Sequence, residues 1–138
     1  MNDQGQEFRF RHTMLPVSDL DRSVAFYTNL LGMHVMRELR VSERGGHKVS
    51  YVGYGKEGTH PALELIEDTS NSDNPWSGHF AIAVSDLPAL ITKLKVAGVR
   101  FTSAMIKPET GMNDYVANIL DPDGFEIELT QRTGGIYN

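Results

Sequence analysis

The sequence of 138 residues contains no cysteine. This absence excludes a disulfide framework, a thiolate zinc site and a cysteine nucleophile, so histidine, aspartate and glutamate are the candidate metal ligands. Basic residues are also scarce, because Lys and Arg number 13 against 18 Asp and Glu and the formal net charge is −5. A protein that binds nucleic acid usually presents a basic surface, and we therefore expect no nucleic-acid partner.

Long hydrophobic runs are missing as well. No apolar run approaches the roughly 18 residues that a membrane helix needs, so we expect no association with a membrane. The first ten residues, MNDQGQEFRF, are polar and have no apolar signal core, which favours a cytoplasmic location. What remains is typical of a globular protein, with 40% hydrophobic and 22% charged residues. The length predicts a single domain that spans residues 1–138.

The most informative feature that is present is an internal repeat. The stretch that begins at His12 and the stretch that begins at His79 both read H-x-x-x-x-V-S-D-L. Each is followed by a helical pattern that ends at a glycine, Gly32 in the first copy and Gly98 in the second. Each copy also ends in a strand pattern with a central glutamate. We interpret the chain as two copies of one small module.

The two modules span about residues 8–68 and 78–131, and each has the same order of predicted elements. A strand opens each module, and the helix after it is marked by possible capping residues, Ser18, Asp19 or Asp21 in the first copy and Asp86 in the second. Three strand-like segments follow each helix, at about residues 33–41, 47–54 and 61–68, and then 99–103, 114–120 and 124–131. Two tandem βαβββ modules predict an α+β fold.

Four residues occupy equivalent places in the two modules, on their first and last strands: His12, Glu64, His79 and Glu128. The apolar residues that alternate with them should face the helix, so these four side chains point away from it. If the modules pair about a pseudo-two-fold axis, the four can converge. Two imidazoles and two carboxylates suit divalent Ni, Co, Zn, Mn or Fe, and leave about two coordination positions open for water or substrate.

The remaining histidines and strand glutamates have no counterpart in the other module. We interpret these histidines as ordinary satisfied or exposed residues and these glutamates as solvated. The residues in question are His34, His47 and His60, and Glu38, Glu43, Glu67 and Glu126.

Several motifs together resemble a known family. They are His12-Thr-Met-Leu, Ser18-Asp-Leu-Asp-Arg-Ser-Val-Ala-Phe-Tyr27, Leu31-Gly-Met33, Tyr51-Val-Gly-Tyr-Gly55, Leu63-Glu-Leu65, Gly78-His-Phe-Ala-Ile82 and Asp121-Pro-Asp-Gly-Phe-Glu-Ile-Glu-Leu129. The chain resembles glyoxalase I (lactoylglutathione lyase) of the vicinal-oxygen-chelate superfamily. The resemblance implies a half-barrel of two βαβββ modules around one divalent metal ion. It places the family's ligands on the four residues that the repeat selected, and favours Ni²⁺ over Zn²⁺ and a homodimer with shared active sites.

The resemblance also implies a reaction on a small molecule, the hemithioacetal of methylglyoxal and a thiol such as glutathione, which becomes a 2-hydroxyacyl thioester. Family analogy favours Glu128 as the catalytic base, with Glu64 as its partner. Two positions depart from the glutathione-using members. Pro16 stands where they carry an arginine that meets a glutathione carboxylate, and Asp68 stands where they usually carry an asparagine. A hydrogen-bond donor to that carboxylate is therefore missing. Lys107 or Arg37 could replace it.

These departures keep two alternatives open. One is another metalloenzyme of the superfamily, such as an Fe(II)-dependent dioxygenase or a tailoring oxygenase. The other is a metal-free protein that sequesters a drug, although such proteins lose the His/Glu set that is retained here. The sequence leaves the native metal, the thiol, the physiological substrate and a domain-swapped arrangement of the dimer undetermined.

Overall fold

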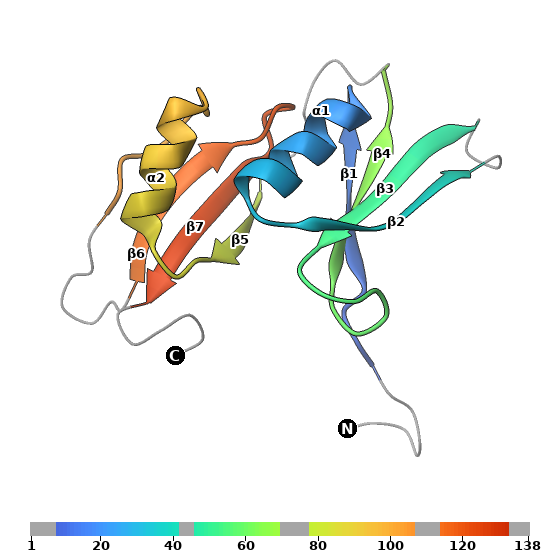
Figure 1. Cartoon of the computed structure of the whole chain (residues 1–138), viewed down its shortest axis with the longest axis horizontal. Helices are drawn as coiled ribbons and strands as arrows, with labels where there is room; N and C mark the ends of the chain where they lie inside the picture. Colours follow the sequence, from blue (N-terminus) through green and yellow to red (C-terminus); the bar gives the residue numbers. More distant parts are fainter. Residues whose placement is uncertain (1–7, 42–45, 70–77, 107–113, 133–138) are drawn as a thin grey trace. The chain divides into compact units, whose positions relative to one another are not determined.

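The computed structural model of the chain divides into two compact units, Met1–Ser72 and Asp73–Asn138. Figure 1 labels their elements. The structure describes residues 8–41, 46–69, 78–106 and 114–132. No helix within these ranges combines the length and the apolar character needed to cross a membrane.

The first unit has the predicted βαβββ order. Its elements are β1 (His12–Val17), α1 (Leu20–Ala25), a π-helical turn η1 (Phe26–Leu30), β2 (His34–Val41), β3 (His47–Gly53) and β4 (Ala62–Glu67). The four strands form one sheet in the order β1-β4-β3-β2. Strand β1 runs parallel to its neighbour β4, and the other pairs are antiparallel. The first and last strands of the unit therefore lie side by side.

The helix of this unit begins where two carboxylates accept its first free N–H groups. Asp19 Oδ1 accepts from the backbone N–H of Arg22 at 3.1 Å, which confirms the predicted cap. Glu67 Oε2, on β4, accepts from the backbone N–H of Leu20 at 3.0 Å. The interpretation of Glu67 as a solvated residue was wrong, because its carboxylate satisfies a helix donor that would otherwise have no partner. Gly32 has φ +72° and follows the helical turn, as predicted.

The second unit repeats most of this plan with fewer strands. Its elements are β5 (His79–Ala83), α2 (Leu87–Val96), β6 (Asp114–Leu120) and β7 (Glu126–Arg132). The sheet order is β5-β7-β6, with β5 parallel to β7 and β6 antiparallel to it. Helix α2 lies over this sheet in Figure 1. Asp86 caps α2 through Ala89, and Gln131 Oε1 accepts from the backbone N–H of Leu87 at 2.6 Å, as Glu67 does in the first unit.

The predicted strand at 99–103 is not formed as a continuous strand, which corrects the βαβββ prediction for the second module. The segment follows β6 through isolated bridges, Phe101 with Ile119 and Ile106 with Val116. Between the bridges, the backbone N–H of Asn118 donates to the Ser103 hydroxyl at 3.1 Å. A serine side chain that takes a backbone donor competes with a β ladder, and here it interrupts the pairing.

The core of each unit lies between its helix and one face of its sheet. On β1 the side chains of Leu15 and Val17 are buried, while Met14, which precedes them, is 48% exposed. On β7 the side chains of Ile127 and Leu129 are buried, and Glu128 is half-buried between them. This alternation is the one predicted, and it leaves the predicted ligands on the opposite face of each sheet.

Candidate metal centre

In the first unit, His12 and Glu64 lie diagonally across the parallel pair β1 and β4. Met14, two residues after His12, is the register partner of Glu64. His12 Nε2 is 3.1 Å from Glu64 Oε2. Glu64 is only 5% exposed, which is unusual for a carboxylate and requires polar partners.

In the second unit, His79 and Glu128 have the same diagonal relation across β5 and β7. Ala81, two residues after His79, is the register partner of Glu128. His79 Nε2 is 3.3 Å from Glu128 Oε2. Each unit therefore brings together one predicted histidine and one predicted glutamate. The convergence of the two pairs on one ion stays a prediction, since each pair belongs to a different unit.

The two pairs have donor sets that fit a divalent metal ion. Histidine nitrogen and carboxylate oxygen bind zinc-like ions at about 2.0–2.2 Å, so two such donors at right angles lie about 3 Å apart. The N···O separations of 3.1 and 3.3 Å match this spacing. The ring nitrogen of His12 that faces the carboxylate is Nε2. The other ring nitrogen, Nδ1, is buried and has no hydrogen-bond partner among the described residues. No group of three or more His, Asp or Glu side chains gathers within the described ranges.

Tyr51 on β3 completes the surroundings of Glu64. The two residues are register partners on adjacent strands, and the Tyr51 hydroxyl donates to Glu64 Oε2 at 2.5 Å. The ring also meets His12 edge-on, with centroids 5.6 Å apart, and the guanidinium carbon of Arg37 lies 4.6 Å from the ring centroid. Tyr51 belongs to one of the family motifs but was not among the predicted site residues. The signal that could have found it was its place opposite Glu64 in the antiparallel register.

Glu128 has different surroundings. Its register partner is Asn118, but the Asn118 amide donates to Glu126 Oε1 at 2.7 Å instead. Glu126 was therefore wrongly interpreted as solvated. The Glu128 side chain is 29% exposed, and within the described part of the chain it makes one polar contact, the one with His79. One unit thus holds its glutamate tightly and the other holds it loosely.

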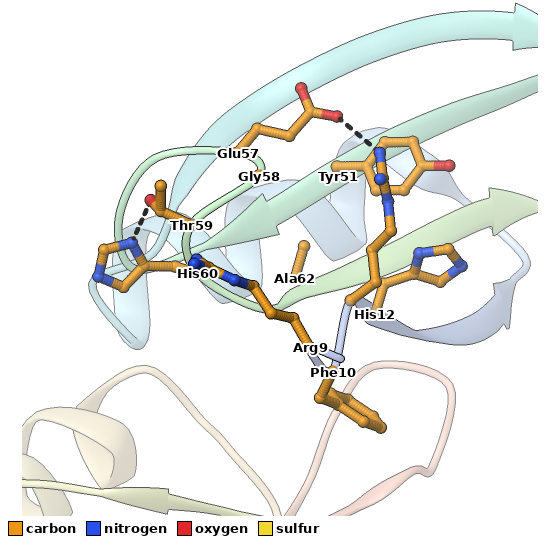
Figure 2. A pocket seen from close by; sticks show the side chains of 10 residues that line it. Arg9, Phe10, His12, Tyr51, Glu57, Gly58, Thr59, His60 and Ala62 are labelled. Atoms are coloured by element: carbon orange, nitrogen blue, oxygen red, sulfur yellow. Dashed lines mark hydrogen bonds and ion pairs between the residues drawn. The ribbon is translucent and has the colours of Figure 1, made fainter. Parts of the chain in front are cut away.

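A pocket of about 290 Å³ opens beside His12 at the start of β1 (Figure 2). Its lining includes two cationic side chains, Arg9 and Arg11. Glu57 carries the opposite charge, with its Oε1 2.9 Å from Arg37 Nε and 3.9 Å from Arg11 Nη2. The other lining residues are Phe10, His12, Tyr51, Gly58, Thr59, His60 and Ala62.

The positions that depart from the glutathione-using pattern lie away from this pocket. Pro16 is near the end of β1, and the backbone N–H of Asp68 donates to Val17 O at 2.8 Å just after β4. The pocket lies at the other end of β1, beyond His12. Of the two candidate replacements for the missing donor, Arg37 contacts Tyr51, and Lys107 lies outside the described residues.

The other histidines have the ordinary roles that were predicted. His34 Nε2 lies 2.6 Å from Gly55 O, and His47 Nδ1 lies 2.6 Å from Glu67 O. His60 Nδ1 lies 2.9 Å from the Thr59 hydroxyl, and both residues line the pocket in Figure 2. Glu43 lies outside the described residues.

The chain is similar to several known proteins. Residues 9–129 match the model of the Glyoxalase/Bleomycin resistance protein/Dioxygenase superfamily. The lactoylglutathione lyase of Salmonella typhimurium is 37% identical over 129 residues, which cover 89% of this chain and 92% of the relative. A probable lactoylglutathione lyase of Vibrio parahaemolyticus is 36% identical over 126 residues, or 89% of this chain and 90% of the relative.

A solved structure is similar over almost the whole chain. The trypanothione-dependent glyoxalase I of Leishmania major is 37% identical and superposes with a TM-score of 0.76. The similarity covers 91% of this chain and 87% of that one.

Proposed function

The chain belongs to the glyoxalase/bleomycin resistance protein/dioxygenase superfamily and is a lyase of the glyoxalase I type, and we propose that its substrate is the hemithioacetal of methylglyoxal and glutathione. The product is the 2-hydroxyacyl thioester. The observation that carries the proposal is the repeated His–Glu pair, at the same diagonal of two sheets and with N···O separations of 3.1 and 3.3 Å. The relatives named above are lactoylglutathione lyases, which favours this activity over a dioxygenase or a drug-binding protein.

We assign one divalent ion to the four residues of the two pairs: His12, Glu64, His79 and Glu128. The superfamily implies such a metal, and Ni²⁺ is our choice ahead of Zn²⁺ or another divalent ion. When bound, the ion would polarise the oxygens of the substrate and stabilise the negative charge that develops on them. A homodimer with shared sites and a cytoplasmic location stay predictions.

Within the proposed reaction, Glu128 is the base. It removes the proton from C1 of the hemithioacetal and returns it to C2, while the proton of the C1 hydroxyl moves to the C2 oxygen. The aldehyde carbon thus becomes the thioester carbonyl and the ketone becomes the 2-hydroxyl. The reaction is an isomerisation and needs no oxidant or reductant. Glu128 suits this role better than Glu64, because its side chain is 29% exposed and is held by a single polar contact within the described residues, whereas the Glu64 side chain is 6% exposed. A base that takes a proton at C1 and delivers it at C2 must reach both carbons, and the looser carboxylate can do so.

The pocket beside His12 supports glutathione, a thiol that carries carboxylates, as the thiol of the substrate. Glutathione carries two carboxylates, and Arg9 and Arg11 present cationic groups in the pocket wall of a protein whose net charge is −5. Guanidinium groups bind carboxylates through paired N–H donors. We propose that this end of β1 receives a carboxylate of glutathione.

The direct test is conversion of the hemithioacetal, followed by the ultraviolet absorbance of the thioester. Metal-stripped protein is assayed before and after addition of Ni²⁺ or Zn²⁺. We expect turnover only with metal, and slower turnover when 2-mercaptoethanol replaces glutathione. A protein that binds metal but converts neither hemithioacetal would refute the proposed reaction and favour another enzyme of the superfamily.

A further inference from the structure

We propose that Tyr51 is a positioning residue, which fixes Glu64 as a permanent metal ligand and thereby leaves the role of base to Glu128. This inference rests on the proposed function for the role of Glu128. The part that concerns Glu64 rests on the geometry of the first unit alone.

The contact between the two residues is short and shielded. A hydroxyl that donates to an ionised carboxylate lies at about 2.5–2.7 Å, and Tyr51 lies at 2.5 Å from Glu64 Oε2. Glu64 is 5% exposed, so water competes little for this bond. A carboxylate has about four acceptor sites, and the tyrosine occupies one of them.

The tyrosine itself is held in place from its other side. The Arg37 guanidinium lies 4.6 Å from the ring centroid, which is a cation–π contact. Arg37 Nε is in turn 2.9 Å from Glu57 Oε1. The ring also meets His12 edge-on. A connected set of contacts therefore fixes the hydroxyl that holds Glu64.

The repeat supplies an internal comparison. Asn118 is opposite Glu128 in the register, as Tyr51 is opposite Glu64. The Asn118 amide donates to Glu126 at 2.7 Å and thus holds the neighbouring glutamate on β7. The two modules therefore provide matching His–Glu pairs, but within the described residues only the first fixes its carboxylate from the adjacent strand. This difference assigns unlike roles to two glutamates that the sequence repeat makes equivalent.

The test is Tyr51→Phe, which removes one hydroxyl and keeps the ring. The matched control is Tyr54→Phe, because the Tyr54 hydroxyl donates to Leu31 O at 2.6 Å, and Tyr54 lies just after the same strand. Each variant is titrated with Co²⁺, and its visible absorption spectrum is recorded. Removal of a group that orients a metal ligand typically costs 10- to 100-fold in metal affinity. We expect a loss of about this size and an altered Co²⁺ spectrum for Tyr51→Phe, and neither change for Tyr54→Phe.

Kinetics at saturating metal separate positioning from a structural role. For Tyr51→Phe we expect kcat to fall several-fold while KM and the melting temperature stay close to those of the parent. Parental Co²⁺ affinity and spectrum in Tyr51→Phe would overturn the inference. If Tyr51→Phe changes the Co²⁺ spectrum but the parent protein converts no hemithioacetal, the positioning of Glu64 is supported and the proposed function is refuted. The two failures can therefore be told apart.

Discussion

Replacement of Glu128 by glutamine separates catalysis from folding more cleanly than any other single change. The substitution keeps the shape of the side chain and removes the group that accepts a proton. General base catalysis contributes about 10²- to 10⁴-fold, so kcat should fall by at least two orders of magnitude. The free energy of unfolding should fall little, because the Glu128 side chain is 29% exposed and its 3.3 Å contact with His79 is partly open to solvent. Such contacts contribute about 0–1 kcal/mol.

The assay is hemithioacetal conversion with saturating metal, together with urea unfolding of the same samples. Glu126→Gln is the matched control, since Glu126 lies on the same face of β7. The side-chain oxygen of the new glutamine can still accept the hydrogen bond from the Asn118 amide. We expect the control to keep most of the activity. Undiminished turnover by Glu128→Gln would remove this residue as the base, and equal losses in both variants would mean that the change acts through the strand.

Three further outcomes follow from named contacts. Glu67→Ala removes the carboxylate that caps the start of α1 and should lower the free energy of unfolding by about 1 kcal/mol, whereas Glu38→Ala should leave the denaturation midpoint unchanged. Arg11→Ala should raise KM about two- to fivefold for the glutathione hemithioacetal but not for that of 2-mercaptoethanol, and equal effects on both thiols would exclude a carboxylate contact. Burial raises the pKa of Tyr54 from 10.0 to about 12, so the neutral phenol stabilises the fold below pH 10 and this contribution is lost towards pH 12. An ultraviolet titration of Tyr54→Phe should lack one ionisation near pH 12, and an unchanged curve would contradict the assignment.

The elements that the sequence predicted well are those specified by local patterns. The caps at Asp19 and Asp86 and the left-handed Gly32 and Gly98 all occur where a short-range signal placed them. The alternation on β1 and β7 was equally local, and it placed His12 and Glu128 on the face of the strand opposite the buried apolar residues.

The features that the sequence did not predict depend on which strands become neighbours. Tyr51 reaches Glu64 only because β3 and β4 pair in one register, and the capping role of Glu67 needs β4 beside the start of α1. The broken pairing at Ser103 arises from a side chain that takes the backbone donor of Asn118, although the local pattern favoured a strand. The two His–Glu pairs were predictable because the sequence repeat places a histidine and a glutamate at equivalent positions on the first and last strands of both modules.

The central claim is that one ion is held by a His–Glu pair from each unit, and metal content tests it most directly. Protein is loaded with Ni²⁺, dialysed, and analysed for bound metal per chain beside His12→Ala and His79→Ala. We expect one ion per chain in the parent and a large loss of bound metal in both variants, because each variant removes one of the four proposed ligands. Full retention of metal in His79→Ala would contradict it, since the ion would then be held without the second unit's histidine.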